Sequence, residues 1–308
     1  MKKLQFKRFA GDTVIIPMLI GVLLNSFCPA LLNIGSFWTS MIHGTSALVG
    51  VFLFFMGTSI NIRSTGKGLA KGAVIMGTKI ALSILIGYAV AFFLNDSFLG
   101  LSSVALIGGL SVGNCAIYSG ITAAMGDDSD KGAVAVTYLS VGPTVLLLAM
   151  SSAGLASISI GSLIGSFLPL LLGIVIGAVS PGLKQIFSAG VTPLMIMVAF
   201  ALGANMSVSQ LIQGGLSGIL LGLIATFVVG ILTVLVERLF FKEGLAAAAI
   251  SSVAASGVAN PQALAEVDPS YAAVAPIATA QIAAAAIVTS FLTPIFAGYI
   301  AKMDGKNR

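Results

Sequence analysis

The stretch that decides the fold reads Ser111-Val112-Gly113-Asn114-Cys115-Ala116-Ile117, in the middle of an apolar segment long enough to cross a membrane. Gly113 is typical of a helix C-terminus, and Asn114 is typical of the N-cap that begins a new helix. A second stretch, Ser256-Gly257-Val258-Ala259-Asn260-Pro261-Gln262, has the same character. Its Asn260–Pro261 pair predicts a cap and a restart, because proline disfavours helix at the preceding residue and suits the first helical position. The sequence therefore predicts two broken helices.

Composition places these segments in a membrane. Of the 308 residues, 57% are hydrophobic and 8% are charged, with a mean hydropathy of +1.08, whereas soluble domains contain about 25% charged residues. A membrane-spanning helix needs about 20 apolar residues. Apolar runs bounded by charges or by Gly, Pro and Asn clusters predict an all-α polytopic membrane protein with ten spans, at residues 12–31, 44–62, 71–94, 100–124, 132–151, 160–180, 190–208, 214–236, 244–267 and 271–301.

The basic residues indicate how these spans are oriented. If the N-terminus is cytoplasmic, 14 of the 15 Lys and Arg residues, Lys71 among them, fall in cytoplasmic loops and tails, and the opposite loops contain none. The positive-inside rule then predicts cytoplasmic N- and C-termini. Because the basic residues do not share one face, nucleic acid is not an expected partner. The basic segment 1–8 resembles the start of a signal peptide, but the long apolar run after it lacks a clear cleavage site and is expected to remain as the first span.

The two halves of the chain resemble each other. Pro17-x-Leu19-Ile20-Gly21 matches Pro169-x-Leu171-Leu172-Gly173 at an offset of 152 residues. The segment 56–62 matches 202–208 at an offset of 146, which pairs Gly57 with Gly203. These matches predict two repeat units, residues 1–151 and 152–308.

Each unit contains five spans. Because five is an odd number, the second unit has to enter the membrane from the opposite side, which makes an inverted repeat. Inverted repeats with interrupted helices at corresponding positions are typical of secondary transporters, whose binding sites lie at the interruptions.

Lys79 is the one basic residue expected deep inside a span. A charge at the centre of a membrane helix costs at least about 2.5–3.5 kcal/mol, so it normally has a partner or a function. We expect Lys79 to act as a counter-ion to an anionic substrate or to exchange a proton; the alternative is that its long side chain reaches the cytoplasmic surface. Thr137, Gln281 and Glu266 are further candidates for ion or proton coupling, although groups such as Thr137 and Gln281 also commonly join membrane helices.

Several classes of function are disfavoured. The sequence has no Walker A or HExxH motif, which disfavours ATP-driven pumping and zinc-dependent hydrolases. His43 is the only histidine and the two cysteines are far apart, so neither a multi-histidine metal site nor a disulfide framework is expected. The segment 127–131 lacks the Gly and distal Glu of a calcium loop and predicts a capped turn. We therefore expect no enzyme activity, metal or cofactor, and a channel is an alternative that transport kinetics would test.

Three stretches are similar to the 2-keto-3-deoxygluconate permease family of bacterial inner membranes, and the resemblance extends over essentially the whole chain. They are Phe54-Phe55-Met56-Gly57-Thr58-Ser59-Ile60-Asn61, Gly109-Leu110-Ser111-Val112-Gly113-Asn114 and Ser256-Gly257-Val258-Ala259-Asn260-Pro261. The resemblance implies import of 2-keto-3-deoxygluconate, a sugar acid, together with protons. It also implies the fold of the wider group that includes the bile acid/sodium symporters. That fold has a panel domain of spans 1, 2, 6 and 7, a core domain of spans 3–5 and 8–10, and broken helices 4 and 9 that cross beside the substrate.

Sodium-coupled members of that wider group have an acidic residue near the break of the ninth helix. Here the residues from Gly257 to Asn260 include no carboxylate, and the first one is Glu266. Lys79 also adds a positive charge nearby. We therefore expect protons as the coupling ion; a sodium-coupled symporter of another organic anion is the alternative.

The candidate substrate residues follow from the two breaks. Because the N-terminal end of a helix attracts anions, we expect the substrate carboxylate to meet the half-helices near Asn114 and Gln262. The expected partners are an anionic sugar acid and the lipid bilayer, and a homodimer is left open. The substrate hydroxyls are expected to meet Asn260, Ser119 or Asn205, and the breaks themselves are assigned to Gly113, Gly257 and Pro261.

Overall fold

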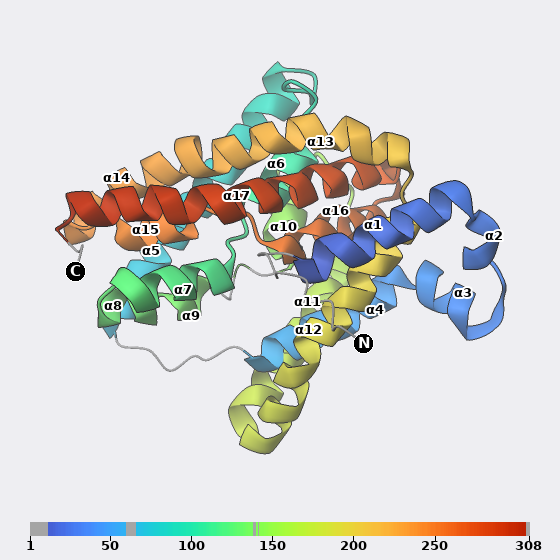
Figure 1. The fold of residues 1–308 in the computed structure, drawn as a ribbon, viewed down its shortest axis with the longest axis horizontal. Coiled ribbons are helices and arrows are strands. Elements are labelled where there is room, and N and C mark those ends of the chain that lie inside the picture. Colours follow the sequence, from blue (N-terminus) through green and yellow to red (C-terminus); the bar gives the residue numbers. More distant parts are fainter. Residues whose placement is uncertain (1–11, 60–65, 138–139, 141, 306–308) are drawn as a thin grey trace, which may run out of the picture.

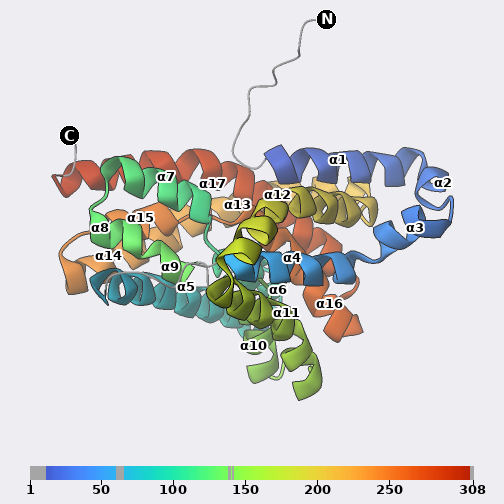
Figure 2. The same cartoon turned by 90° about the horizontal axis from the view of Figure 1, so that it is seen from below.

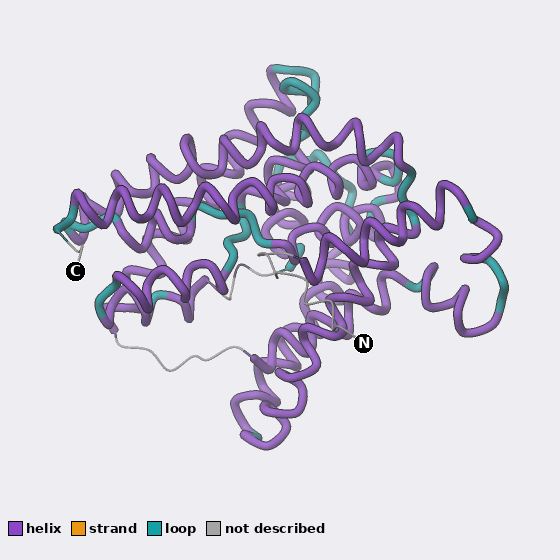
Figure 3. Tube along the Cα trace, viewed as in Figure 1, coloured by secondary structure: helices purple, strands orange, loops and turns teal. Residues whose placement is uncertain are grey.

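The computed structural model describes residues 12–59, 66–137, 140 and 142–305. Apart from one isolated bridge between Phe98 and Leu101, every regular element in these residues is a helix. Figures 1 and 3 show these helices following one another along the chain. A helix satisfies its backbone hydrogen bonds internally, which is why it suits a chain this apolar.

The helices of the first half of the chain are α1 (Asp12–Phe27), α2 (Pro29–Leu32), α3 (Ser36–His43), α4 (Thr45–Ser59), α5 (Gly66–Phe93), α6 (Ser103–Leu110), α7 (Cys115–Met125), α8 (Asp128–Gly132), α9 (Val134–Thr137) and α10 (Thr144–Ser152). Those of the second half are α11 (Ile160–Val179), α12 (Pro181–Ala204), α13 (Val208–Leu223), the π-helix η2 (Ile224–Val229), α14 (Gly230–Phe241), α15 (Leu245–Ile250), the 3₁₀ helices η3 (Ala255–Ala259) and η4 (Pro269–Tyr271), α16 (Asn260–Val267) and α17 (Ala275–Met303).

Six helices in the described part of the chain are long and apolar enough to cross a membrane. A seventh span results if α3 and α4, which meet at a bend of 68°, are taken as one. Large apolar side chains cover the outside of the molecule; Leu216 and Leu239, for example, are each 80% exposed. Exposed apolar surface of this extent marks contact with lipid. The chain is therefore a multi-pass membrane protein. The six helices are Gly66–Phe93, Ser103–Met125, Ile160–Val179, Pro181–Ala204, Leu211–Phe241 and Ala275–Met303.

The number of long apolar helices is smaller than the ten predicted spans, because the other predicted spans consist of short helices in the described part of the chain. The first predicted span is divided between α1 and α2, and the ninth between α15 and α16. The prediction of one helix over 132–151 is wrong, since this segment is divided between α9 and α10. Gly142 there has a φ of +98°, and Pro143 lacks the N–H that a continuous helix needs. The helix α12 also begins earlier than predicted, at Pro181.

The helices pack in two groups. In the first group, α1 lies along α12, α11 lies along α4, and α12 also contacts α4 and α11. In the second group, α13 lies along α17, α5 contacts α6, α8, α9 and α14, and α15 contacts α7, α14 and α17. Figures 1 and 2 show α1 beside α12 in the first group and α13 beside α17 in the second.

Glycines allow the closest contacts within the first group. In the α1–α12 pair, a Cβ atom added at Gly21 or at Gly203 would collide with the backbone of the opposite helix. The same is true of Gly57 and Gly173 in the α4–α11 pair. Small residues of this kind let membrane helices approach until their backbones touch.

Candidate functional site

The first interruption separates α6 from α7. Asn114 precedes α7 as its N-cap, and its side-chain oxygen accepts hydrogen bonds from the backbone N–H groups of Ala116 and Ile117, each at 3.1 Å. The cap predicted at Asn114 is therefore confirmed. Gly113 permits a close approach, because a Cβ atom there would collide with the side chain of Ile250.

The second interruption is longer than the sequence predicts. Residues 251–254 are not helical, and the 3₁₀ helix η3 follows them before α16 begins. The prediction that Asn260 caps α16 is wrong, since Ala259 holds the N-cap position and Asn260 and Pro261 open the helix. The reason is a competing partner: the buried Asn260 amide donates a hydrogen bond to the Gly108 carbonyl at 2.9 Å. That carbonyl lies in the last turn of α6, where helices leave carbonyls without internal partners.

The two interruptions contact each other. The N–H of Asn114 donates a hydrogen bond to Ser252 Oγ at 3.0 Å. The bond from Asn260 to Gly108 joins the start of α16, after the second break, to the end of α6, before the first. Gly257 lies so close to the first break that a Cβ atom there would collide with Val112. We call residues 111–114 and 251–259 together the junction.

Lys79 reaches the junction from α5. Its ammonium nitrogen lies 2.9 Å from the carbonyl oxygen of Ile250 and 2.6 Å from that of Ser252, and the residue is 1% exposed. These carbonyls lie at and just after the C-terminal end of α15, where the helix dipole favours a positive charge. Among the described residues, no carboxylate forms a salt bridge with Lys79. The Lys79 side chain is thus buried at the junction and does not reach the surface.

Threonine hydroxyls satisfy more of the junction backbone. Thr226 and Thr293 each donate a hydrogen bond to the Ser251 carbonyl at 3.3 Å, and the N–H of Val253 donates to the Thr289 hydroxyl at 3.0 Å. Non-helical backbone at the depth of a membrane needs such partners, because lipid supplies none.

A cavity of about 390 Å³ lies between the junction and the helices α4 and α12. The start of α7 contributes Asn114 and Cys115 to its lining. Hydroxyl groups come from the other side: Ser59 of α4 lies against Ser188 of α12, with 3.2 Å between their Oγ atoms, and Thr192 follows one turn later. Among the residues that the structure describes, the lining contains no carboxylate and no basic side chain. The cavity therefore offers a helix N-terminus and several hydroxyls to a ligand.

None of these hydroxyls was predicted from the sequence as part of a site. Ser59 lies in a repeated segment and in one of the three family-like stretches, but neither pattern assigns it a contact with substrate. Ser188 and Thr192 belong to a helix that is otherwise apolar over long stretches, and their spacing of four residues on one face of α12 is the only signal that points to them.

A second cavity, of about 270 Å³, lies between α4, α11 and α16. Gln262 and Glu266 of α16 line it together, and the Gln262 amide donates a hydrogen bond to Glu266 at 3.0 Å. Ser162 and Ser166 of α11 face the same space. Asn114 and Gln262, which the sequence suggested for one carboxylate, thus line different cavities.

Four other predicted residues line neither cavity. Asn205 ends α12, and its amide donates to the carbonyls of Ile42 and Ala201. Ser119 lies on α7 beyond the capped turn. The buried Gln281 amide joins α17 to α13, since it donates to Ser217 Oγ at 2.9 Å. Of these four residues, Thr137 is the one whose side chain contacts a residue of the cavity lining: its hydroxyl lies 3.3 Å from the Cys115 sulfur.

The chain is similar to known proteins along its whole length. The sequence profile of the 2-keto-3-deoxygluconate permease family matches residues 3–306. The 2-keto-3-deoxygluconate permease 1 of Salmonella typhimurium is 37% identical over 306 residues, which cover 99% of this chain and 96% of the relative. The 2-keto-3-deoxygluconate permease of Enterobacter sp. is 33% identical, with 98% of this chain and 94% of the relative covered. That of Escherichia coli is 34% identical, with 95% and 92% covered.

Proposed function

Because the chain belongs to the 2-keto-3-deoxygluconate permease family, whose members are transport proteins rather than enzymes, we propose that it imports 2-keto-3-deoxygluconate or a similar sugar acid by proton symport. The observation that carries this proposal is the first cavity, in which the N-terminus of α7 and the hydroxyls of α4 and α12 surround one space. A sugar acid has the complementary groups, namely one carboxylate and several hydroxyls.

The substrate carboxylate binds near Asn114 in this proposal. The N-terminal end of α7 carries a partial positive charge, and none of the described residues that line the cavity is a carboxylate that would repel an anion. The substrate hydroxyls bind Ser59, Ser188 and Thr192 on the opposite wall. These three residues replace Ser119 and Asn205, which the sequence suggested as partners of the hydroxyls. Asn260, the third residue suggested there, acts indirectly, because its hydrogen bond to Gly108 holds the two breaks together.

We further propose that the chain forms ten spans in two inverted units. Packing supports this relation, because α1 lies on α12 as α11 lies on α4, and α5 contacts α6 as α14 contacts α15. Gly21 matches Gly173 in the repeat, and Gly57 matches Gly203. The close contact of α1 with α12 uses Gly21 and Gly203, and that of α4 with α11 uses their counterparts, Gly173 and Gly57. The helices α1, α4, α11 and α12 then form the panel domain and the others the core domain, with the first cavity between them.

The distribution of basic residues supports cytoplasmic termini, and the similarity to bacterial permeases supports a bacterial inner membrane as the location. In that orientation the first cavity lies toward the cytoplasm, since Ser59 ends α4 and Ser188 lies near the start of α12, beside the basic loops. The second cavity, with Gln262 and Glu266, lies toward the outside. Cavities on opposite sides of a junction suit a carrier that alternates its access.

Lys79 is the proposed proton-coupling group. Its ammonium lies at the carbonyls that follow α15, where a coupling cation would be stabilised. Loss of a proton from this group removes the positive charge from the junction that lines the cavity. Thr137, Gln281 and Glu266 remain weaker proposals for the same role. The Thr137 hydroxyl donates to the Val134 carbonyl of its own helix, Gln281 joins α17 to α13, and Glu266 is exposed at the second cavity.

Uptake of radiolabelled substrate into proteoliposomes tests the proposal. We expect saturable accumulation driven by an inward proton gradient, competition by other sugar acids, and no effect of a sodium gradient. Accumulation driven by sodium would support the alternative, a sodium-coupled symporter of another organic anion, and flux that neither saturates nor accumulates would indicate a channel. The Lys79→Gln variant addresses the coupling group: uptake that stays fully proton-dependent would rule out its role.

A further inference from the structure

A second group of buried charges surrounds Lys71, near the start of α5 and apart from the cavities. The helix α5 begins at Gly66, five residues before the predicted start of this span at Lys71, and α8 and α14 cover its first turns. The Lys71 side chain is 0% exposed and forms salt bridges with Asp130 of α8, with Glu243 at 2.8 Å and with Glu237 of α14 at 3.5 Å. We call these four residues the Lys71 cluster.

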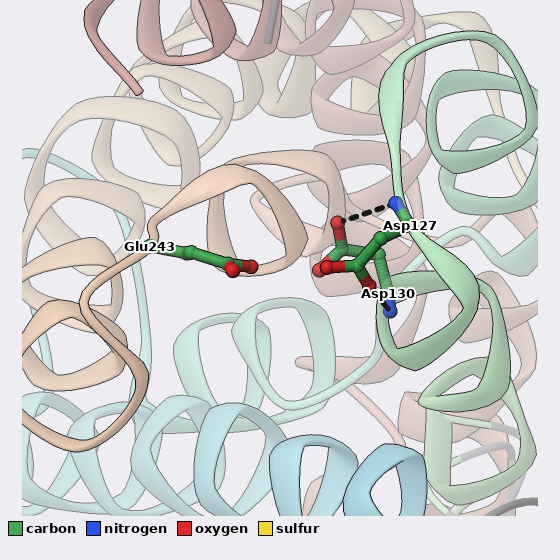
Figure 4. Close-up of side chains that lie close together, drawn as sticks. All are labelled: Asp127, Asp130 and Glu243. Atoms are coloured by element: carbon green, nitrogen blue, oxygen red, sulfur yellow. Dashed lines mark hydrogen bonds between the residues drawn. The ribbon is translucent and has the colours of Figure 1, made fainter. Parts of the chain in front are cut away.

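Figure 4 shows the Asp130 and Glu243 carboxylates pointing toward each other, with Asp127 beside Asp130. Oxygen atoms of these three residues lie within 4.8 Å of one another. Asp127 and Asp130 form a capping box at the start of α8, which is the capped turn that the sequence predicts. The Lys71 ammonium donates hydrogen bonds to Asp130 and Glu243 and so supplies positive charge at this point.

Glu237 is the least compensated member of the Lys71 cluster. Its side chain is fully buried, and its Oε2 accepts a hydrogen bond from the N–H of Ala247 at 2.6 Å. Its Oε1 has no hydrogen-bond partner among the described residues, and Lys71 lies 3.5 Å from it while bonding to two other carboxylates. Burying an ionised carboxylate with so little compensation is costly, and a bound proton removes that cost.

The elements around Glu237 offer no second cation in the described part of the chain. The helix α15 and the π-helix η2 contain no titratable side chain, and α5 presents Lys71. Tyr118 of α7 donates its hydroxyl to the backbone carbonyl of Asp130. Arg238, the next residue on α14, is paired with Asp304 at 2.8 Å. A proton is therefore the ligand that the position of Oε1 fits.

We propose that Glu237 is a proton-binding site of the transporter, an inference that rests on the proposed function for its part in the transport cycle. A proton binds Oε1 and converts the carboxylate into a neutral acid, while Lys71 remains charged between Asp130 and Glu243. On release, the proton passes to water beside Glu243, whose side chain is 26% exposed.

The helix α15 connects this site to the junction. Glu237 accepts a hydrogen bond from the N-terminal turn of α15, and Lys79 donates to the carbonyls at its other end. The bond from Ala247 is charge-assisted only while Glu237 is ionised, and it weakens when a proton neutralises the carboxylate. Binding of a proton at Glu237 thereby alters how firmly α15 is held beside the substrate cavity.

The Glu237→Gln variant mimics the protonated acid and retains an oxygen for the N–H of Ala247. Asp304→Asn is the matched control, because it neutralises another carboxylate, 6% exposed, that already has Arg238 as its partner. Thermal unfolding of each purified protein is measured from mildly acidic to mildly alkaline pH. We expect the difference in Tm between Glu237→Gln and wild type to change with pH, because only the folded wild type gains or loses the Glu237 proton over this range. A difference that stays constant with pH overturns the proposal, and the control is expected to follow the wild-type profile.

Transport supplies the second measurement. In proteoliposomes we expect Glu237→Gln to exchange substrate across the membrane but to lose accumulation driven by a proton gradient. Accumulation equal to that of the wild type overturns the coupling role. If wild-type protein shows no proton-driven uptake, the proposed function fails, while the unfolding profiles still decide whether Glu237 binds a proton. If Glu237→Gln does not fold, infrared spectra of the wild type replace it. We expect a protonated carboxyl band that disappears as the pH is raised, and a spectrum without such a band overturns the proposal.

Discussion

The ammonium nitrogen of Lys79 lies 2.9 Å from the carbonyl oxygen of Ile250, the last residue of α15. Its positive charge is thus balanced by backbone carbonyls and the negative end of a helix dipole, and no carboxylate in the described part of the chain forms a salt bridge with it. The same bond satisfies backbone that the interruption of the helix leaves without partners. Lys79 therefore supports the structure of the junction in addition to its proposed role in coupling.

Lys79→Met is expected to lower the free energy of unfolding. The carbonyls of Ile250 and Ser252 lose their donor, and a buried acceptor without a partner costs about 1–3 kcal/mol. Thermal unfolding in detergent measures the effect. Lys67→Met, at an exposed position on the same helix, is the control, and equal Tm values for the two variants would contradict the prediction.

Asn114→Asp is expected to separate capping from substrate binding. Aspartate caps a helix about as well as asparagine, so the stability should stay close to that of the wild type. Its charge, however, faces the cavity, and like charges about 4 Å apart near a protein surface repel by about 4 kcal/mol. We expect KM for the sugar acid to rise at least about tenfold, which corresponds to about 1.4 kcal/mol.

Asn114→Ser is the control for this experiment, because serine caps the helix without adding charge. It should bind the substrate far better than Asn114→Asp. Equal KM values for the two variants would argue against a carboxylate site at the start of α7.

Gly173→Ala is expected to destabilise the α4–α11 pair. The added methyl group collides with the backbone carbonyl of Phe54, and overpacking of this kind typically costs about 1–3 kcal/mol. Gly165→Ala, on the same helix with open space at its Cβ position, is the control for the better helix propensity of alanine. Thermal unfolding should give a lower Tm for Gly173→Ala than for Gly165→Ala, and the reverse order would contradict the close packing.

Asp268 provides a prediction on pH. Its carboxylate accepts hydrogen bonds from the Ser270 hydroxyl at 2.6 Å and from the N–H of Ser157 at 2.7 Å, which ties the segment before α11 to the end of α16. These bonds, the one from the Ser270 hydroxyl foremost, hold the pKa of Asp268 below its usual range. The stabilisation is therefore present at neutral pH and is lost as the pH falls through the lowered pKa.

Hydrogen exchange of the segment 153–159 measures this tether. After correction for the intrinsic pH dependence of exchange, Asp268→Asn should exchange faster than wild type at neutral pH, and the wild type should approach it only in acid. Asp128→Asn, which removes an exposed carboxylate elsewhere, should leave the segment unchanged. Equal protection in Asp268→Asn and wild type would mean that the tether does not hold the segment.

Local features of the site were predictable from the sequence. The cap at Asn114 involves N–H groups only two and three residues further along the chain, and a local pattern is enough to reveal it. Asn260 is likewise an asparagine at the start of a helix, but its hydrogen-bond partner, Gly108, lies 152 residues earlier in the chain. Ser59 and Ser188 are 129 residues apart. No local pattern could show that either pair meets.

Lys71 illustrates the same limit for charges. Its position at the predicted start of a span suggested only the cytoplasmic side, and its carboxylate partners come from α8, α14 and the residue after Lys242. The sequence showed how many charges the chain has, but their pairing depended on how three helices pack.

The sequence alone determined that this chain crosses a membrane as helices, that it belongs to its family, and that one of those helices restarts at Asn114. These properties depend on the transfer free energy of continuous apolar runs and on capping within a few residues. Only the tertiary structure decided that Lys79 meets the end of α15, that Glu237 meets its beginning, and that the hydroxyls of α4 and α12 face one cavity. The physical reason is that helices apolar on all sides have no stripe to indicate which face is buried, so their rotation and register are set only when they pack together.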